Sequence, residues 1–355
     1  MNHPPSILIR ADGNPDIATG HLMRTLSIAL ALRERGAAVT FAVSDNVSAD
    51  LLFSFFPAGV FFPVFVLHSD YRRPETETET LKTLPCLGES DDCLLLVDSY
   101  FVTPSYLTAL RQLGRVAYLD DLNSFDYPVD CVINYDAAPS REHYSDVPLQ
   151  LLGLAYTPLR RQFSGLVPRV RPRVKHLLLS TGGTDAANVS GRLLCLLLED
   201  PECADWHYHI PAGPLHAHRQ ELEQLAKAHP TVHLYEHVEN MAGLMKSCDL
   251  AVSAAGTTLY ELCAAGLPAV SFTMADNQLA VASDMQTCAG IPCGGDIRAG
   301  FRAQAGIRRL KKLLLGLAGD YSARLALSEK MHRQIDGKGA DRIAEALLGL
   351  IVRET

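Results

Sequence analysis

The sequence predicts an α/β protein made of two doubly wound domains. Three observations favour this fold class: apolar strand-like runs alternate with helical patterns, glycine-rich loops follow several of these runs, and 355 residues exceed the usual length of one domain. The chain is 48% hydrophobic and 20% charged, so it has enough apolar side chains for two cores. This composition argues against a disordered or fibrous protein.

In the first half, the alternation is typical of a parallel sheet with helices on both faces. We predict strands at 7–11, 38–44, 93–99, 115–121 and 131–135, and helices at 21–35 and 105–113. The first helix has apolar residues at helical spacing and a stop signal at Gly36. Residues 68–92 are polar and irregular, and we expect them to form a solvated surface segment.

A second α/β series follows the proline- and arginine-rich region 136–173, part of which we interpret as the crossing between domains. We predict strands at 176–180, 206–212, 232–236, 249–255 and 268–272, and helices at 185–199, 307–315 and 340–352. The N-terminal domain is thus placed at 1–160 and the C-terminal domain at 161–355, with the last helix free to pack back on the N-terminal domain. Two such domains leave an interdomain cleft, and ligands bind at the carboxyl ends of the strands.

Charge, cysteine content and hydropathy limit the function classes. The net charge of −8 disfavours a general nucleic-acid binder, although a helix N-terminus can still bind a small anion. The nine cysteines are odd in number and lack a CxxC pair, so we expect buried thiols in a reducing compartment. The N-terminus lacks a signal-peptide pattern, and prolines interrupt the most apolar stretch, 51–67. We therefore expect a cytoplasmic protein without a membrane partner.

The first candidate site is the loop 10–24, in which a glycine-rich turn joins a strand to a helix that starts near His21. The positive end of a helix dipole disfavours protonated histidine, and a neutral imidazole can act as a general base. The alternative is a capping or packing histidine. Asp12, at the strand end, is predicted either to orient the base or to form the turn. Neither the dinucleotide fingerprint nor the P-loop pattern is present.

The second candidate site is the segment 253–278. A strand there runs into Gly256, Thr257 and Thr258, whose free N–H groups and hydroxyls are suited to a diphosphate. Glu261 lies one turn further along, where its carboxylate can accept both ribose hydroxyls; the alternative is that it complements the helix dipole. A second loop, 274–278, follows the next strand and is expected beside the first.

Three further groups are weaker candidates. The glycine pair in 180–188 either faces the same ligand or forms an ordinary turn with Asp185 as the helix cap. The histidines at 207, 209, 216 and 218 and the aspartates at 120 and 121 are clustered, but neither group has convincing ligand spacing. We predict no metal site. A GxSxG nucleophile motif is absent.

Nine motifs occur along the chain in a defined order. They are RADxxxxIxTGHLMR (10–24), VDSY (97–100), YLDDL (118–122), VINYD (132–136), YTPLRRQF (156–163), STGGTD (180–185), SAAGTTLYELCAAGLP (253–268), ADNQ (275–278) and DGKGADRI (336–343). Over nearly the whole chain this set resembles the PseG family, the UDP-2,4-diacetamido-2,4,6-trideoxy-β-L-altropyranose hydrolases of pseudaminic acid biosynthesis. The C-terminal motif alone also looks like the nucleotide-binding half of the lipid II-forming N-acetylglucosaminyltransferase.

The resemblance implies a GT-B-like architecture of two Rossmann-like domains with the active site between them. It also implies metal-independent, inverting hydrolysis of the sugar C1–O bond, without a cofactor, to give UDP and 2,4-diacetamido-2,4,6-trideoxy-L-altrose. This sugar would pass to a sialic-acid-synthase-like enzyme on the way to flagellin glycosylation. The family's catalytic histidine falls on His21, and other motif residues fall on Tyr100, Asn277 and Glu261.

From the candidate loops and the resemblance together, we predict a set of site residues. His21 is the proposed catalytic base. The substrate contacts are assigned to Asp12, Gly20, Arg24, Tyr100, Arg160, Gly183, Asn277 and Gln278, and the nucleotide contacts to Gly256, Thr257, Thr258 and Glu261.

The chain departs from the family pattern at a few small residues. Ala18 and Thr25 stand where the family often has Gly and Cys, and 254–258 reads Ala-Ala-Gly-Thr-Thr instead of Ala-Gly-Gly-Ser-Thr. The stretch 76–92 also looks longer than in compact members. The sequence leaves open a GT-B-type UDP-sugar glycosyltransferase, a hydrolase of a related UDP-diamino sugar, and a nucleotide-sugar-binding regulatory subunit. The intact Gly20–His21 pair favours an enzyme.

Overall fold

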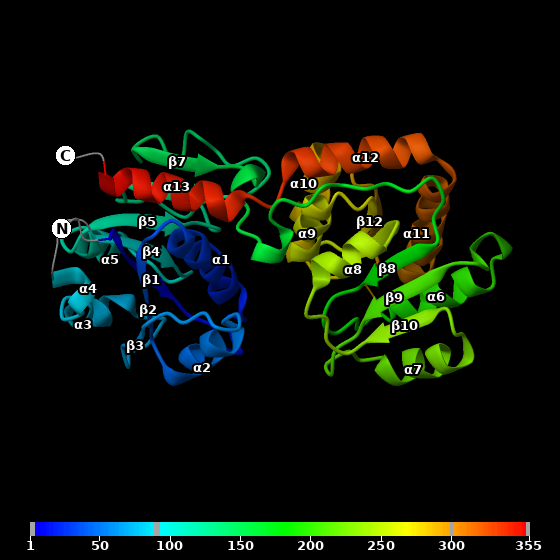
Figure 1. The fold of residues 1–355 in the computed structure, drawn as a ribbon, viewed down its shortest axis with the longest axis horizontal. Coiled ribbons are helices and arrows are strands. Elements are labelled where there is room, and N and C mark those ends of the chain that lie inside the picture. Colours follow the sequence, from blue (N-terminus) through cyan, green and yellow to red (C-terminus); the bar gives the residue numbers. More distant parts are fainter. Residues whose placement is uncertain (1–3, 89–92, 299–300, 353–355) are drawn as a thin grey trace. The chain divides into compact units, whose positions relative to one another are not determined.

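The computed structural model describes residues 4–88, 93–298 and 301–352, and the chain forms two compact units (Figure 1). The first unit combines the chain up to Arg161 with the chain from Lys338 onward, and the second comprises Gln162–Gly337. Each unit is built around one parallel sheet flanked by helices. The predicted fold of two doubly wound α/β domains is confirmed.

Within the described residues, the sheet of the first unit has seven strands in the order β3-β2-β1-β4-β5-β6-β7, all parallel to their neighbours. The strands are β1 (Ser6–Ala11), β2 (Ala38–Val43), β3 (Val64–Val66), β4 (Cys93–Asp98), β5 (Arg115–Leu119), β6 (Cys131–Asn134) and β7 (Leu149–Leu152). The short edge strands β3 and β7 were not predicted. The strand order reverses between β1 and β4, and such switch points are where ligands of these sheets bind.

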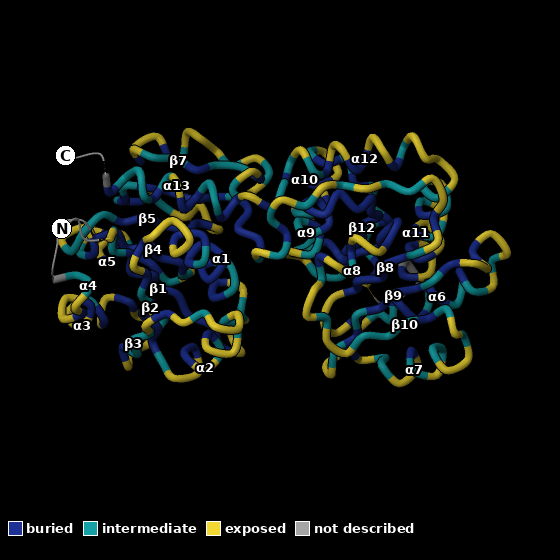
Figure 2. The backbone as a smooth tube through the Cα atoms, viewed as in Figure 1, coloured by how far each residue is buried: buried dark blue, intermediate teal, exposed yellow. Residues whose placement is uncertain are grey.

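Helices cover both faces of this sheet. They are α1 (Gly20–Glu34), α2 (Asn46–Phe55), α5 (Pro104–Leu110) and α13 (Gly339–Val352). The last helix, α13, packs against α1, and its Ile343 and Leu347 share a buried cluster with Ile7 and Leu26. Because side chains alternate along β1, the next residue, Leu8, belongs to the cluster on the other face, which includes residues of α5. Figure 2 shows the central strands as buried.

The segment 68–88 lies mostly at the surface, as predicted, but it is folded instead of irregular. It contains a 3₁₀-helix η1 (Pro74–Glu77) and the short helices α3 (Thr78–Leu81) and α4 (Pro85–Gly88). Leu81 is buried, and so is Glu77, because the Glu77 carboxylate pairs with buried Arg10. A polar residue that is buried through an ion pair leaves no hydrophobic pattern in the sequence. The end of the predicted segment, 89–92, lies outside the described residues.

The sheet of the second unit has six strands in its described part, in the order β10-β9-β8-β11-β12-β13. The strands are β8 (His176–Ser180), β9 (His207–Pro211), β10 (Val232–Tyr235), β11 (Leu250–Ala254), β12 (Ala269–Thr273) and β13 (Cys293–Asp296). The helices are α6 (Val189–Leu198), α7 (Arg219–Ala228), α8 (Met241–Ser247), α9 (Thr257–Ala265), α10 (Asn277–Cys288), α11 (Phe301–Gly319) and α12 (Tyr321–Gln334). This order also reverses at its centre, between β8 and β11.

Two details of the second unit differ from the prediction. The helix expected at 185–199 begins only at Val189, because Asp185 has a positive φ of 41° and its carboxylate accepts from the N–H groups of Val189 and Ser190. The glycine-rich strand β13 was not predicted, since it lacks an apolar run. Across the described helices of the chain, none combines the length and the apolar composition needed to span a bilayer.

Candidate functional site

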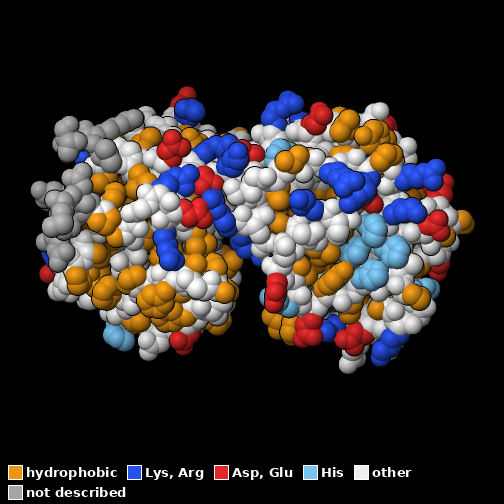
Figure 3. Space-filling view, viewed as in Figure 1, with side chains coloured by type: hydrophobic (Ala, Val, Ile, Leu, Met, Phe, Trp, Pro, Cys, Tyr) orange, Lys and Arg blue, Asp and Glu red, His pale blue; other side chains and the backbone are white. Residues whose placement is uncertain are grey.

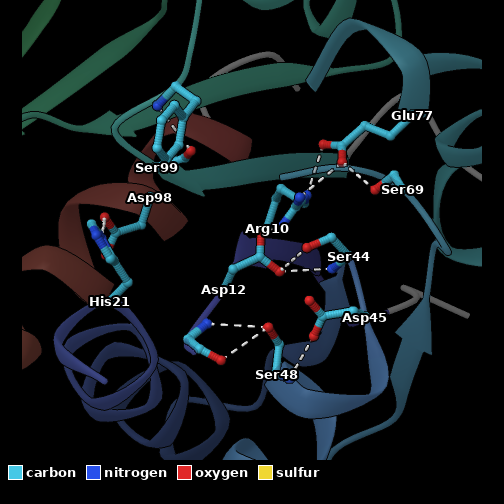
Figure 4. Close-up of polar contacts among 12 residues, drawn as sticks. Arg10, Asp12, His21, Ser44, Asp45, Ser48, Ser69, Glu77, Asp98 and Ser99 are labelled. Atoms are coloured by element: carbon cyan, nitrogen blue, oxygen red, sulfur yellow. Dashed lines mark hydrogen bonds and ion pairs between the residues drawn. The ribbon is translucent and has the colours of Figure 1, made fainter. Parts of the chain in front are cut away.

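His21 and Asp98 meet at the carboxyl edge of the first unit's sheet. His21 is the second residue of α1, and Asp98 is the last residue of β4, which lies next to β1. The Nδ1 atom of His21 lies 2.5 Å from Asp98 Oδ1, and both side chains are buried (Figure 4). With its proton on Nδ1, the neutral imidazole keeps Nε2 as its basic nitrogen. This is the geometry of a general base oriented by a carboxylate.

Arg24 binds the same carboxylate from one turn further along α1. Its Nε donates to Asp98 Oδ2 and its Nη2 to Asp98 Oδ1, each at 2.6 Å. Burial alone would raise the pKa of Asp98, but Arg24 and His21 outweigh it, and the pKa falls to about 2. Asp98 is therefore ionised at neutral pH, so it can accept a hydrogen bond from the Nδ1–H group of His21.

The remaining contacts of Arg24 lie at the ends of two further strands. Its Nη1 lies 2.7 Å from Asp121 Oδ2, after β5, and donates to Tyr135 Oη at 2.7 Å, after β6. Burial raises the pKa of Asp121, and Arg24 opposes this shift. The Arg24 side chain is only 12% exposed. The donors of Arg24 are directed at protein acceptors, so Arg24 holds this cluster together, and its substrate contact stays a prediction.

Tyr100 and Gly20 border His21 on the exposed side of the cluster. The Tyr100 ring lies edge-on to the imidazole, with the ring centroids 4.4 Å apart, and Tyr100 is 42% exposed. Burial raises the pKa of its hydroxyl, and so does the nearby Asp121 carboxylate, so the hydroxyl stays protonated. Gly20 is exposed, and a Cβ at this position would have no atom within 4 Å. Both positions suit the predicted substrate contacts.

Asp12 does not orient His21, so this part of the prediction was wrong. Asp12 Oδ1 accepts from the N–H and the hydroxyl of Ser44, each at 2.7 Å, and Oδ2 accepts from Arg10 Nη1 at 2.5 Å (Figure 4). These bonds occupy both carboxylate oxygens of Asp12, which is buried. Asp98 has the orienting role instead. The sequence signal for Asp98 is a single acidic residue that ends an otherwise apolar strand, CLLLVD.

The adjacent Asp120 and Asp121 serve separate purposes. Asp120 is buried and accepts hydrogen bonds from the hydroxyls of Tyr127 and Tyr144 and from the turn that follows it, whereas Asp121 pairs with Arg24. Over the residues that the structure describes, no group of three or more His, Cys, Asp or Glu side chains is arranged to hold a metal ion.

Three of the second unit's candidate loops follow β8, β11 and β12, which are neighbours in its sheet. Gly183 comes after β8, Gly256 after β11 and Asn277 after β12, so parallel pairing brings all three loops to one edge. Gly183 and Asn277 are exposed, and Gly256 is half-buried. The side chain of Gln278 turns back to accept from the N–H of Met274 at 2.8 Å, which closes the loop before α10.

The turn into α9 offers fewer free donors than predicted. The N–H of Gly256 donates to Ala254 O at 2.9 Å, so it is not available to a ligand. Among the described hydrogen bonds, none uses the N–H of Thr257 or Thr258, and these two amides begin α9. Glu261 lies one turn along α9 and is half-buried. The N-terminus of α9 therefore provides two main-chain donors for an anion, followed by a carboxylate.

Arg160 and the histidines that are clustered in the sequence of the second unit lie in different parts of the structure. Arg160 is a half-buried residue of the first unit, in the segment between η2 (Leu154–Tyr156) and η3 (Arg161–Phe163). His216 lies 3.5 Å from buried Asp185, beside the loop that holds Gly183. His216 is close to His207 and His209 in the sequence, but the latter two belong to a separate histidine cluster on β9.

One known family model matches part of the second unit. Residues 177–283 match the family model of the glycosyltransferase family 28 C-terminal domain. This segment runs from β8 into α10, and it includes all three candidate loops of the second unit. The match covers less than half of the chain.

Two relatives and two solved structures are similar over larger parts of the chain. An uncharacterized protein of Methanocaldococcus jannaschii is 24% identical over 288 residues, covering 74% of this chain and 54% of its own length, so the chain spans about half of that relative. The spore coat polysaccharide biosynthesis protein SpsG of Bacillus subtilis is 23% identical over 363 residues, covering 98% of both.

The solved structures include MurG of Acinetobacter baumannii, with a TM-score of 0.68, 15% identity and coverage of 98% of this chain and 100% of that one. They also include the UDP-GlcNAc 2-epimerase of Neisseria meningitidis bound to UDP-GlcNAc, with a TM-score of 0.62, 13% identity and coverage of 97% and 100%. At such identities the likeness shows the fold alone, which is the GT-B-like pair of Rossmann-like domains.

Proposed function

We propose that this chain is an enzyme that hydrolyses a UDP-sugar at the sugar C1–O bond with inversion. The observation that carries the proposal is the buried pair of His21 and Asp98, with 2.5 Å between Nδ1 and Oδ1, at the switch point of the first sheet. The free amides of Thr257 and Thr258 support it, because they suit the diphosphate of a nucleotide. A spore coat polysaccharide biosynthesis protein among the relatives also fits nucleotide-sugar metabolism.

In the proposed mechanism, His21 Nε2 removes a proton from water while the water oxygen forms a bond to C1. The electron pair of the C1–O bond leaves with UDP, and attack from the opposite face inverts the anomeric centre. Asp98 stabilises the imidazolium through its bond to Nδ1. The N–H groups of Thr257 and Thr258 donate to the departing diphosphate, whose charge increases in the transition state.

For the particular substrate, we propose UDP-2,4-diacetamido-2,4,6-trideoxy-β-L-altropyranose, on the basis of the nine ordered motifs. The sugar would bind beside His21 and Tyr100, and the nucleotide beside Thr257, Thr258 and Glu261. The product would then be used by a sialic-acid-synthase-like enzyme in pseudaminic acid biosynthesis.

The decisive experiment is incubation of the enzyme with this UDP-sugar in the absence of any acceptor. We expect stoichiometric release of UDP, and NMR of the first-formed sugar should show the α anomer before mutarotation. A glycosyltransferase is the second candidate, favoured by the family 28 match over 177–283. UDP release that requires an added acceptor would favour the transferase. UDP binding without any turnover would indicate a regulatory subunit.

Metal dependence provides a further prediction. If helix N-terminal amides neutralise the diphosphate, hydrolysis should continue at an unchanged rate in excess EDTA. Activity that EDTA abolishes and Mg²⁺ or Mn²⁺ restores would contradict the proposed mechanism.

A further inference from the structure

Four histidines form a cluster on one face of the second unit's sheet. His176 begins β8, His207 and His209 lie on β9, and His233 lies on β10. Figure 3 shows histidine side chains gathered on the surface of this unit. We call these four residues the histidine stack. It lies toward the amino ends of β8 and β9, whereas the candidate nucleotide loops follow the carboxyl ends.

The four rings are joined by stacking and by two direct contacts between ring nitrogens. His176 Nδ1 lies 3.0 Å from His209 Nε2, and His207 Nδ1 lies 3.0 Å from His233 Nε2. The other neighbouring rings stack: the centroids of His176 and His207 are 5.1 Å apart, and those of His209 and His233 are 5.0 Å apart. An N–H···N bond needs one ring to donate and the other to accept, so each pair contains at least one neutral imidazole.

Few neighbouring groups compensate additional positive charge in the stack. Tyr235, on β10, places its hydroxyl 2.8 Å from His209 Nδ1. Asp249, which precedes β11, accepts from the main-chain N–H of His176, but it is paired with Arg171 at 2.7 Å. The thiol of Cys248 is buried, and burial raises its pKa, so it stays uncharged.

His209 is the most enclosed member of the stack. It is 8% exposed. Burial, and to a lesser extent the positive charges that His233, His176 and His207 acquire on protonation, lower its pKa to about 4. Burial also lowers the pKa of His176, against the opposing effect of Asp249, and lowers the pKa of His233.

We propose that the histidine stack is a proton-sensitive latch, which holds β9 and the edge strand β10 to β8 while neutral and loosens them on proton uptake. The proposal is independent of the enzymatic activity proposed above. An unfolded histidine has a pKa near 6.5, above the folded value for His209, so the unfolded state binds more protons. The stabilisation is therefore complete above pH 6.5 and is lost as the pH falls toward 4.

The test uses the single tryptophan of the chain, Trp206, which is buried in the core of the second unit next to His207. Its fluorescence reports urea unfolding of this unit in the full chain at pH 7.5 and pH 5.0. Because folded His209 stays largely neutral while unfolded His209 takes up a proton, the unfolding equilibrium constant should rise roughly 20- to 30-fold from pH 7.5 to pH 5.0. His209→Gln keeps a donor and an acceptor, and it should remove this part of the pH response.

His237→Gln is the matched control, because His237 is an exposed histidine of the same unit. It should respond to pH as the wild type does. An equal pH response in wild type and His209→Gln would overturn the proposal, and so would a His209 side chain that titrates near pH 6.5 by nitrogen NMR. If His209→Gln does not fold, hydrogen exchange of the wild type provides the test. The amides of β9 and β10 should lose protection at pH 5.0 while those of β12 keep it. An equal loss of protection in all three strands would contradict the latch.

Discussion

The carboxyl edges of the two sheets differ in how their polar groups are satisfied. At the first edge, Arg10 donates to Glu77 at 2.7 and 2.8 Å and to Asp12 at 2.5 Å, and all three side chains are buried. Burial would lower the pKa of Arg10, but the two carboxylates outweigh this effect and raise it. The polar groups of the first edge therefore satisfy one another.

The second edge leaves several polar groups without partners. In the described part of the chain, the amides of Thr257 and Thr258 make no hydrogen bond, and neither do the buried hydroxyls of Thr181 and Thr273. Asn277 is exposed at the same edge. A buried polar group without a partner is unfavourable by about 1–3 kcal/mol. The comparison indicates that the first edge is organised before any ligand binds, as a catalytic group requires, whereas the second edge has unused capacity for a ligand.

The largest effect is expected from removing the base of the first edge. His21→Asn should lower kcat by roughly 10²–10⁴ while it leaves UDP affinity nearly unchanged, because general base catalysis contributes this much. Steady-state kinetics and calorimetry measure the two quantities. His68→Asn is the control, since His68 is exposed and its positive φ of 51° is one that asparagine tolerates. Activity of His21→Asn within a few-fold of wild type would refute the assignment.

The second-largest effect is expected from breaking a buried ion pair at the first edge. Glu77→Ala leaves Arg10 as a buried charge with one carboxylate fewer, and it should destabilise the first unit by about 3–5 kcal/mol. Urea unfolding followed by circular dichroism, with hydrogen exchange of β1, would detect the loss.

Glu79→Ala is the matched control for this substitution. Glu79 lies two residues further on, and its side chain is 83% exposed in a pair with Lys82, so its removal should change stability by less than about 1 kcal/mol. Equal effects of the two substitutions would contradict the difference between buried and exposed charges.

A smaller effect is expected at the second edge. If the Glu261 carboxylate accepts the ribose hydroxyls, Glu261→Ala should weaken UDP binding by roughly 10- to 150-fold, which corresponds to about 1.5–3 kcal/mol. The effect on kcat should be much smaller than that of His21→Asn, because the ribose is remote from the reacting carbon. Calorimetry with UDP and 2′-deoxy-UDP measures it. Equal binding of both nucleotides by the wild type would place the nucleotide elsewhere.

The smallest effect concerns the loop that leads to His21. Ala18 has a φ of 58°, a conformation that favours glycine, and the family resemblance also points to glycine at this position. Ala18→Gly should stabilise the first unit by about 0.5–1 kcal/mol. Glycine relieves the backbone strain, and this gain exceeds the cost of the larger conformational entropy that glycine gives the unfolded chain. Ala109→Gly, within α5, should change stability in the opposite direction. Thermal unfolding of both variants checks the signs.

The sequence was sufficient for most of the fold, because apolar runs such as 93–98 mark the buried strands directly. It did not distinguish Asp12 from Asp98 as the partner of His21. Both are acidic residues at strand ends. Which of them contacts His21 depends on the order of the strands in the sheet, and the local sequence pattern does not encode that order. Glu77 was missed for a related reason, since its burial depends on Arg10, which lies 67 residues away.

The histidine stack shows the same limit. The sequence grouped His207 and His209 with later histidines on the chain, but His176 and His233 join them through strand pairing. Only the parallel register of β8, β9 and β10 brings the four rings together.

The position of α13 has a consequence for how the protein is made. The first unit draws its core from both ends of the chain, with Ile343, Ala344 and Leu347 of α13 buried against residues of α1 and β1, while the second unit is one continuous stretch. On the ribosome, the second unit can therefore fold as soon as it has emerged. The unit that contains His21 cannot complete its core until α13, which follows the second unit in the chain, has been synthesised.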